Sequence, residues 1–190
     1  MLSSIVIDAE LEYDKPTVDV KCPEGCTACM KACPTQAIYE PQKLNPRRCI
    51  AFNAWFTQDG KPAGLTSHIP PEIREKMGTR VHGCDVCQEV CPRNQAKLKA
   101  LRPADEFLVK ISHDFSLSQM LNMTDEFYET RVQPLMYNYI KERKYFQRNA
   151  AWALGKISGR SAKQILKASG NRETSETVKK EIQAALGAIQ

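Results

Sequence analysis

Two cysteine-rich runs constrain this chain of 190 residues more than any other feature. The first run covers residues 22–34 and the second covers residues 84–92, and each ends in a cysteine followed by proline. Cysteines at such short spacings can place several thiolates on one metal centre. The sequence contains eight cysteines, and Cys49 is the only one outside the two runs. We therefore expect this part of the chain to be organised around metal–thiolate sites.

The cysteine before each proline indicates how the ligands are grouped. In two-cluster ferredoxins, a C-x2-C-x2-C-x3-C-P run supplies three ligands to one 4Fe-4S cluster, and its last cysteine ligates the other cluster. Applied here, with Cys49 completing the second set, the rule gives two sets of four. The first set is Cys22, Cys26, Cys29 and Cys91. The second set is Cys33, Cys49, Cys84 and Cys87.

Two departures separate the chain from a minimal ferredoxin. The first gap holds three residues, 23–25, instead of two, and Gly25 can adopt the backbone angles that an extra loop residue needs. Cys49 and Cys84 are separated by a long insertion around Trp55, where a ferredoxin has two residues. The sequence does not assign a function to this insertion.

Zinc and disulfide bonds are the alternatives for cysteines in this pattern. Zinc takes four thiolates in a tetrahedron, but a zinc site needs no proline after its last ligand. Disulfides form in oxidising compartments, and nothing at the amino terminus resembles a secretory signal. The repeated cysteine–proline pattern therefore favours two 4Fe-4S clusters.

Composition is that of an ordinary soluble protein. The hydrophobic content is 42%, the net charge is +5, and no apolar run approaches the length needed to span a membrane. We expect a cytoplasmic protein without a membrane partner.

Residues 3–13 predict one β-strand near the amino terminus. Apolar side chains alternate there, as in a half-buried strand. The alternating positions are Ile5, Ile7, Ala9, Leu11 and Tyr13. No second strand of similar quality follows, so the segment either folds back onto its own domain or pairs with a sheet in another polypeptide or in a missing upstream part. We favour the second interpretation.

The chain changes character at about Pro103, after which helical patterns follow one another. Apolar stripes at helical spacing run through residues 146–157, 162–166 and 178–189. Paired helices with an Arg-Asn-Ala-Ala-x-Ala-Leu-Gly segment resemble a HEAT repeat, which buries its apolar face by stacking. We therefore predict a mostly α fold in three parts. They are an edge strand at 1–20, a double 4Fe-4S cluster domain at 21–102 and a helical HEAT-like domain at 103–190.

A basic segment lies on the predicted helical domain. Lys141, Arg143, Lys144 and Arg148 have only Glu142 in opposition. Such a segment suits contact with the phosphate backbone of a nucleic acid. A solvated helix face, with the neighbouring aromatic residues in the core, explains the same pattern. The residues alone leave both interpretations open.

Three stretches resemble the epoxyqueuosine reductase family. They are Cys26–Ile38, Arg47–Ile50 and Ile69–Asn94, and the family also has a HEAT-like tail after its clusters. The resemblance implies a cobalamin-dependent reductase that removes the epoxide oxygen from epoxyqueuosine at the wobble position of a tRNA. It also implies that two 4Fe-4S clusters pass electrons from a carrier, such as ferredoxin or flavodoxin, to the cobalt of cobalamin.

In that family an amino-terminal domain holds most of the cobalamin and supplies the catalytic acid, and this chain starts at about the last strand of that domain. The resemblance therefore implies a chain without catalytic residues and inactive alone, either a fragment or a subunit completed by a separate cobalamin-binding chain. It makes Asp85, directly after Cys84, a neighbour of the corrinoid. It also assigns the tRNA-facing surface to the basic segment at 141–148.

A stand-alone electron carrier is the second hypothesis. A two-cluster, ferredoxin-like carrier or redox subunit would use the same cysteines, and its helical tail would bind a protein instead of tRNA. Such a carrier would ignore tRNA, whereas the reductase part would bind tRNA with salt-sensitive affinity.

Overall fold

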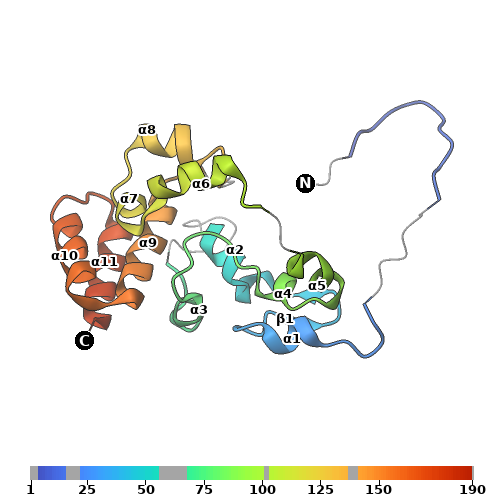
Figure 1. Ribbon diagram of the computed structural model, residues 1–190, viewed down its shortest axis with the longest axis horizontal. Coiled ribbons are helices and arrows are strands. Elements are labelled where there is room, and N and C mark those ends of the chain that lie inside the picture. The colour runs from blue at the N-terminus through green and yellow to red at the C-terminus, as the bar shows by residue number, and fades with distance from the viewer. Residues whose placement is uncertain (1–3, 16–21, 56–67, 101–102, 137–140, 190) are drawn as a thin grey trace.

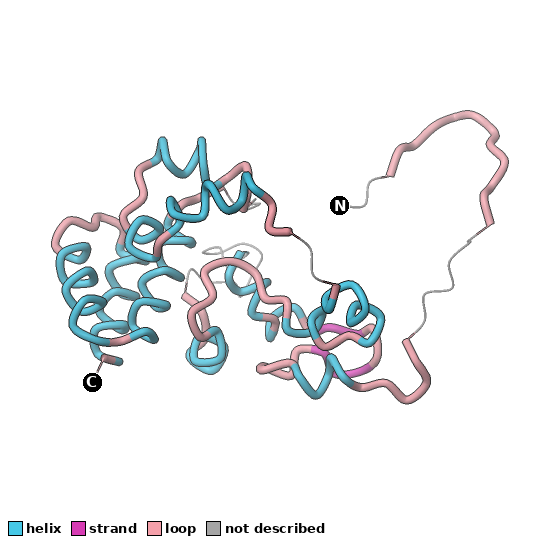
Figure 2. The backbone as a smooth tube through the Cα atoms, in the orientation of Figure 1, coloured by secondary structure: helices cyan, strands magenta, loops and turns pink. Residues whose placement is uncertain are grey.

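The computed structural model describes residues 4–15, 22–55, 68–100, 103–136 and 141–189. Within these ranges the chain is mostly helical and has one small sheet of two strands (Figures 1 and 2). The prediction of a mostly α fold is confirmed. None of the helices in these ranges combines the length and the apolar character that a membrane span requires.

The amino-terminal segment differs from its prediction. Residues 4–15 form no strand, and Figure 1 shows them as an extended arm directed away from the helices. Their apolar side chains face solvent, with Ile5 87% and Tyr13 96% exposed. Within the described ranges this segment therefore pairs with no other strand, and its pairing with a sheet in another polypeptide or an upstream part stays a prediction. An extended segment becomes a strand only where a second strand supplies its hydrogen-bond partners.

The region around the cysteines consists of short elements joined by turns. They are α1 (Ala28–Ala32), β1 (Ile38–Glu40), β2 (Lys43–Leu44), η1 (Pro46–Arg48), α2 (Ile50–Trp55), α3 (Pro71–Met77), α4 (Val86–Glu89) and α5 (Pro92–Lys99). Proline opens three of them, at Pro46, Pro71 and Pro92, because its fixed φ suits the first helical position. β1 and β2 pair antiparallel, with Ile38 opposite Leu44. With so little regular structure, turns and side-chain contacts position the cysteines.

The tail consists of further helices, and the last three are the longest. The tail elements are α6 (Glu106–Ser112), η2 (His113–Phe115), α7 (Leu117–Leu121), α8 (Asp125–Phe127), η3 (a π-helical turn, Tyr128–Val132), α9 (Lys144–Ile157), α10 (Gly159–Gly170) and α11 (Glu176–Ala188). Side-chain caps fix the starts of three of them, including α8, where Thr124 accepts a hydrogen bond from the N–H of Phe127 at 3.1 Å. Asp105 accepts a hydrogen bond from the N–H of Leu108 at 3.0 Å before α6, and Ser116 accepts one from Gln119 at 3.2 Å before α7.

Helix α9 is the centre of the tail. Every residue from Tyr145 to Gly155 is buried, and α7, α10 and α11 pack around the helix. The three predicted apolar stripes meet in this core, except that Ile157 is 58% exposed at the end of α9. Gly155 allows α9 and α11 to approach closely, because a Cβ placed there would lie 2.9 Å from the Cβ of Ala185.

The insertion between Cys49 and Cys84 joins the cysteine region to the tail. Its described parts form α2 and α3, whose apolar residues make a second core with Trp152 of α9. Two charged contacts add to this junction: Arg74 lies 3.3 Å from Glu181, and Lys156 lies 2.5 Å from Glu75. The structure therefore gives the described part of the insertion a packing function that the sequence did not assign.

Candidate metal centres

The first predicted ligand set surrounds one cavity. Its four thiols line a cavity of about 340 Å³ together with proline, alanine and amide side chains. The four are Cys22, Cys26, Cys29 and Cys91. They come from the loop before α1, from α1 itself and from the residue that precedes α5. Cys91 joins the other three because α1 packs against α4, the short helix that lies between Cys84 and Cys91 in the second run. The structure thus brings thiols from both runs to one place.

A tight turn closes the wider gap between Cys22 and Cys26. The N–H of Cys26 donates to the carbonyl of Pro23 at 3.0 Å, and Gly25 has a φ of +66°. That left-handed conformation is strained for residues with a side chain. The extra residue is therefore accommodated by glycine, as the sequence predicts.

The second predicted set is brought together in part. Burial raises the pKa of the Cys87 thiol, and the neighbouring thiols of Cys84 and Cys49 raise it further by repulsion between like charges. These three thiols therefore lie close enough to interact. The described contacts of Cys33, the fourth member, are with its own loop.

The loop after Cys33 supplies hydrogen bonds to its sulfur. Burial alone would raise the pKa of Cys33, but bonds from the Thr35 hydroxyl and from backbone N–H groups outweigh this effect and lower it. The N–H of Ala37 lies 3.2 Å from the sulfur, and the Thr35 hydroxyl lies 3.6 Å from it. Such bonds favour the thiolate, and in iron–sulfur proteins they tune the reduction potential.

The donor set fits a thiolate-bound cluster. Four thiols line a cavity whose other lining residues include no carboxylate, and soft sulfur ligands select iron–sulfur clusters or zinc. Across the described ranges, no three cysteine, histidine or acidic side chains are placed to hold a single metal ion.

An aromatic stack, which the sequence does not predict, lies beside Cys84. The ring of His82 lies between Trp55, at 4.8 Å, and Phe146, at 5.3 Å. Burial lowers the pKa of His82, which favours the neutral ring. The stack holds the loop before Cys84 against α2 and α9. The three rings come from segments far apart in the chain, so the spacing of residues in the sequence does not reveal this stack.

Asp85 is exposed at the start of α4, and its side chain makes no capping bond to the helix. Its position next to Cys84 leaves it accessible to another molecule. The role of Asp85 as a neighbour of the corrinoid stays a prediction.

Arg148 requires a correction, because its side chain cannot reach a nucleic acid. It is 0% exposed, and its guanidinium donates to Asn149 Oδ1 at 3.0 Å and to the carbonyls of Asn53 and Ala54 at 3.2 and 3.5 Å. It also lies over the ring of Tyr145 at 5.2 Å. Arg148 therefore binds the end of α2 to α9 instead of facing solvent.

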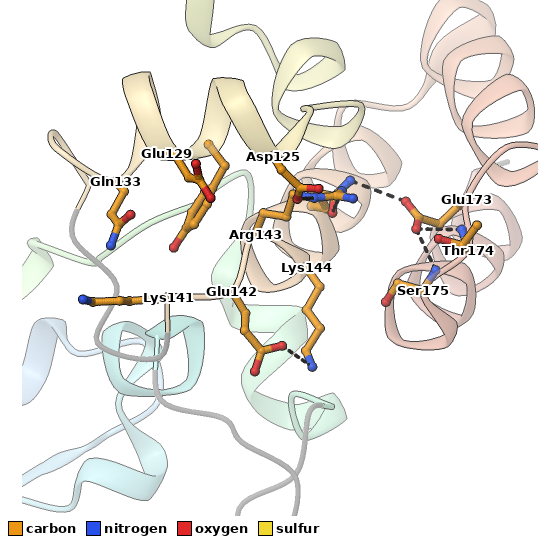
Figure 3. A pocket seen from close by; sticks show the side chains of 12 residues that line it. Asp125, Glu129, Gln133, Lys141, Glu142, Arg143, Lys144, Glu173, Thr174 and Ser175 are labelled. Carbon is orange, nitrogen blue, oxygen red and sulfur yellow. Dashed lines mark hydrogen bonds and ion pairs between the residues drawn. The ribbon is translucent and has the colours of Figure 1, made fainter.

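The other three predicted tRNA contacts line a pocket of mixed charge (Figure 3). Lys141, Arg143 and Lys144 share this pocket of about 520 Å³ with four carboxylates. The carboxylates are those of Asp125, Glu129, Glu142 and Glu173. Arg143 pairs with Asp125, and Lys144 pairs with Glu142. The expectation that only Glu142 opposes the basic segment is therefore wrong, because the fold brings further acids from η3, α8 and the loop before α11.

Comparison with known proteins gives a consistent result. Residues 21–94 match the family of 4Fe-4S double cluster binding domains. The chain is 34% identical over 161 residues to an epoxyqueuosine reductase of Bacillus subtilis, covering 85% of this chain and 38% of that protein. It is 42% identical over 94 residues to an epoxyqueuosine reductase of Escherichia coli, covering 50% of this chain and 22% of that protein.

Solved structures extend the likeness to the fold. An epoxyqueuosine reductase from Streptococcus thermophilus superimposes with a TM-score of 0.73 at 29% identity, covering 95% of this chain and 44% of that one. An epoxyqueuosine reductase solved with an epoxyqueuosine-modified tRNA stem loop gives a TM-score of 0.58 at 26% identity, covering 92% of this chain and 52% of that one. The chain thus spans about half or less of the length of these relatives.

Proposed function

Since this chain belongs with the epoxyqueuosine reductases over part of their length, we propose that it is the electron-transfer and tRNA-docking part of an oxidoreductase of that kind. In this proposal, its clusters deliver electrons to cobalamin for the reduction of epoxyqueuosine to queuosine in tRNA. The cobalamin is bound mainly by another domain or by a separate chain, so the 190 residues alone are inactive.

One observation carries the proposal: the four thiols of the first set line a single cavity. Three come from the first cysteine run, and Cys91 comes from the second. This arrangement supports cross-braced ligation, in which each run completes the other run's cluster.

The chain's own residues bind and shield the two centres. A 4Fe-4S cluster supplies a one-electron carrier when it is bound. The eight thiolates hold the two clusters, and prolines and Ala28 line the first cavity. The hydrogen bonds to the Cys33 sulfur stabilise negative charge in the second set.

For cobalamin, the chain offers an exposed edge instead of an enclosing site. Asp85 is exposed beside Cys84, and the stack of Trp55, His82 and Phe146 holds the preceding loop in place. We assign Asp85 to contact with a corrinoid held by another domain or chain. A complex of this chain with a cobalamin-binding partner should therefore weaken on Asp85→Lys, whereas cluster content stays unchanged.

For contact with tRNA, we propose Lys141, Arg143 and Lys144 and no longer include Arg148, because its side chain is buried. The relative solved with a tRNA stem loop supports a tRNA contact, and the paired acids limit how much each cation adds. Each lost phosphate contact lowers the dependence of log K on log salt by about 0.9 for a duplex stem. Lys141→Ala/Lys144→Ala should therefore reduce that slope by roughly 2.

Anaerobic purification tests the redox part. We expect about eight irons and eight sulfides per chain, a spectrum of two 4Fe-4S clusters and no retained corrinoid. Colourless protein that contains zinc would contradict the proposal.

The stand-alone carrier is the second candidate, and one observation favours it. The predicted tRNA pocket holds four carboxylates against three cations, which suits a protein partner at least as well as RNA. Equal affinity for tRNA in wild-type protein and in Lys141→Ala/Lys144→Ala would support the carrier and end the tRNA-docking part of our proposal.

A further inference from the structure

We propose that helix α5 is the docking surface for an acidic one-electron carrier protein that reduces the first centre. This inference rests on the proposed function, because it requires a cluster held by the first cysteine set. It adds the position of the donor and the residues that receive it.

The first set is the more accessible of the two. Cys22 is exposed, whereas the four thiols of the second set are all half-buried. Cys84 also packs against the apolar core formed by α2, α3 and Trp152. Electron transfer between proteins requires a short distance between the two cofactors. A donor approaching from solvent can therefore come close to the first centre before it reaches the second.

Basic residues lie beside the first cysteine set. Helix α5 begins directly after Cys91, and it carries Arg93, Lys97 and Lys99 without any acidic residue. Arg93 lines the cavity of the first set. In the described part of the chain, Lys97 and Lys99 form no ion pair, in contrast to Arg143 and Lys144 of the tail. The α5 surface is therefore basic, whereas the pocket of the tail is of mixed charge.

The partner's chemistry follows from this surface. Unpaired cations attract a negatively charged protein and raise its association rate. Leu98 is 56% exposed between Lys97 and Lys99, so an apolar contact lies among the charges. Complexes between redox proteins are small and transient, which suits a surface of one short helix. RNA would use the same charges but has no need of a redox centre beneath them, so we favour the acidic carrier.

The electron count is simple. The carrier's reduced centre loses one electron, the oxidised 4Fe-4S cluster gains it, and no bond forms or breaks. In Figure 1, α2 and α3 lie between α5 and the pair α10 and α11. A carrier on α5 therefore leaves the tail free for its own partner.

The test reverses charge at α5 in the 190-residue chain, purified anaerobically with its clusters. The variant is Lys97→Glu/Lys99→Glu. The matched control is Lys163→Glu/Lys167→Glu, which makes the same change of charge at two exposed lysines of α10. The probe is a reduced, acidic plant-type 2Fe-2S ferredoxin, whose oxidation is followed by stopped-flow absorbance and rapid-freeze EPR. Dithionite reduction and tRNA affinity are measured on the same samples.

We expect the second-order rate with ferredoxin to fall about tenfold or more in the α5 variant at low salt, and to approach the wild-type rate at high salt. The control should keep the wild-type rate, and dithionite should reduce all three proteins alike. Equal ferredoxin rates in variant and control would overturn the inference while leaving the proposed function intact. So would a loss of tRNA affinity without a loss of ferredoxin rate. A wild-type chain that dithionite cannot reduce would overturn both.

Discussion

Replacing Arg148 by alanine should destabilise the fold. It should not remove a tRNA contact, because the side chain is buried. The side chain is completely buried and donates to the carbonyls of Asn53 and Ala54, near the carboxyl end of α2, and to Asn149 Oδ1. The Ala54 carbonyl keeps a second bond, from Asn149 Nδ2 at 3.3 Å. The carbonyl of Asn53 and the Oδ1 of Asn149 each lose a buried donor.

The magnitude follows from these two losses. A buried acceptor that loses its donor costs about 1–3 kcal/mol, so the pair costs roughly 2–6 kcal/mol. The lost contact with the Tyr145 ring adds about 0.5–2 kcal/mol. These losses agree with the cost of removing one member of a buried charged network, which is about 3–5 kcal/mol. With about 4 kcal/mol as the central value, the melting temperature should fall by roughly 8–16 °C in a chain of this size.

Thermal unfolding followed by circular dichroism measures this effect, and Arg143→Ala is the control. Arg143 pairs with Asp125, which is 79% exposed, and it also donates to the Met123 carbonyl at 3.3 Å and to Gln147 Oε1 at 2.7 Å, so its removal should cost about 1–3 kcal/mol, less than the loss of Arg148. A folded Arg148→Ala variant that melts within about 3 °C of wild type would refute the packing argument. If that variant also lost more tRNA affinity than Arg143→Ala, Arg148 would have to be counted among the residues that bind tRNA.

Two further changes test the tail. Gly155→Ala should destabilise by about 1–3 kcal/mol, because the new Cβ would meet Ala185 at 2.9 Å, whereas Gly187→Ala, in open space on α11, should be neutral or stabilising by up to about 1 kcal/mol. Chemical denaturation compares the two, and equal effects would contradict the close approach of α9 and α11. Burial raises the pKa of Glu181 above its ordinary value of 4.5, although Arg74 and Arg148 partly offset this. The folded state therefore binds a proton more readily than the unfolded state, so this group's contribution to stability falls as pH rises from the ordinary value through the raised one. The stability of wild type relative to Glu181→Gln should decline over that interval by at most about 1.4 kcal/mol per pH unit, and a rise would contradict the direction.

The sequence predicts those features that depend on local chemistry. Ligand spacing groups Cys22 with Cys91 because the cysteine–proline rule holds for a whole class of iron–sulfur proteins, and both thiols line one cavity. Helical periodicity predicts the buried faces of α9, α10 and α11, because packing follows the 3.6-residue repeat. Gly25 also occupies the turn that the widened gap requires.

Features that depend on distant partners are not predicted. The two carbonyl acceptors of Arg148 lie 94 and 95 residues away in the chain, so its burial has no local signature. Asp125 and Glu173 reach the basic segment only through the packing of separate elements. The alternating pattern from Ile5 to Tyr13 satisfies strand periodicity, but no described segment of this chain pairs with it. Long-range packing decided each of these outcomes.

Cluster content in paired cysteine variants tests the cross-braced arrangement most directly. Cys22→Ser/Cys91→Ser removes two ligands from the same proposed set, whereas Cys22→Ser/Cys33→Ser removes one from each. Iron analysis and EPR on anaerobic protein should find the second cluster intact in the first variant, with about four irons per chain, and both clusters damaged in the second. Intact retention of one cluster in Cys22→Ser/Cys33→Ser, with damage to both in Cys22→Ser/Cys91→Ser, would contradict the ligand grouping.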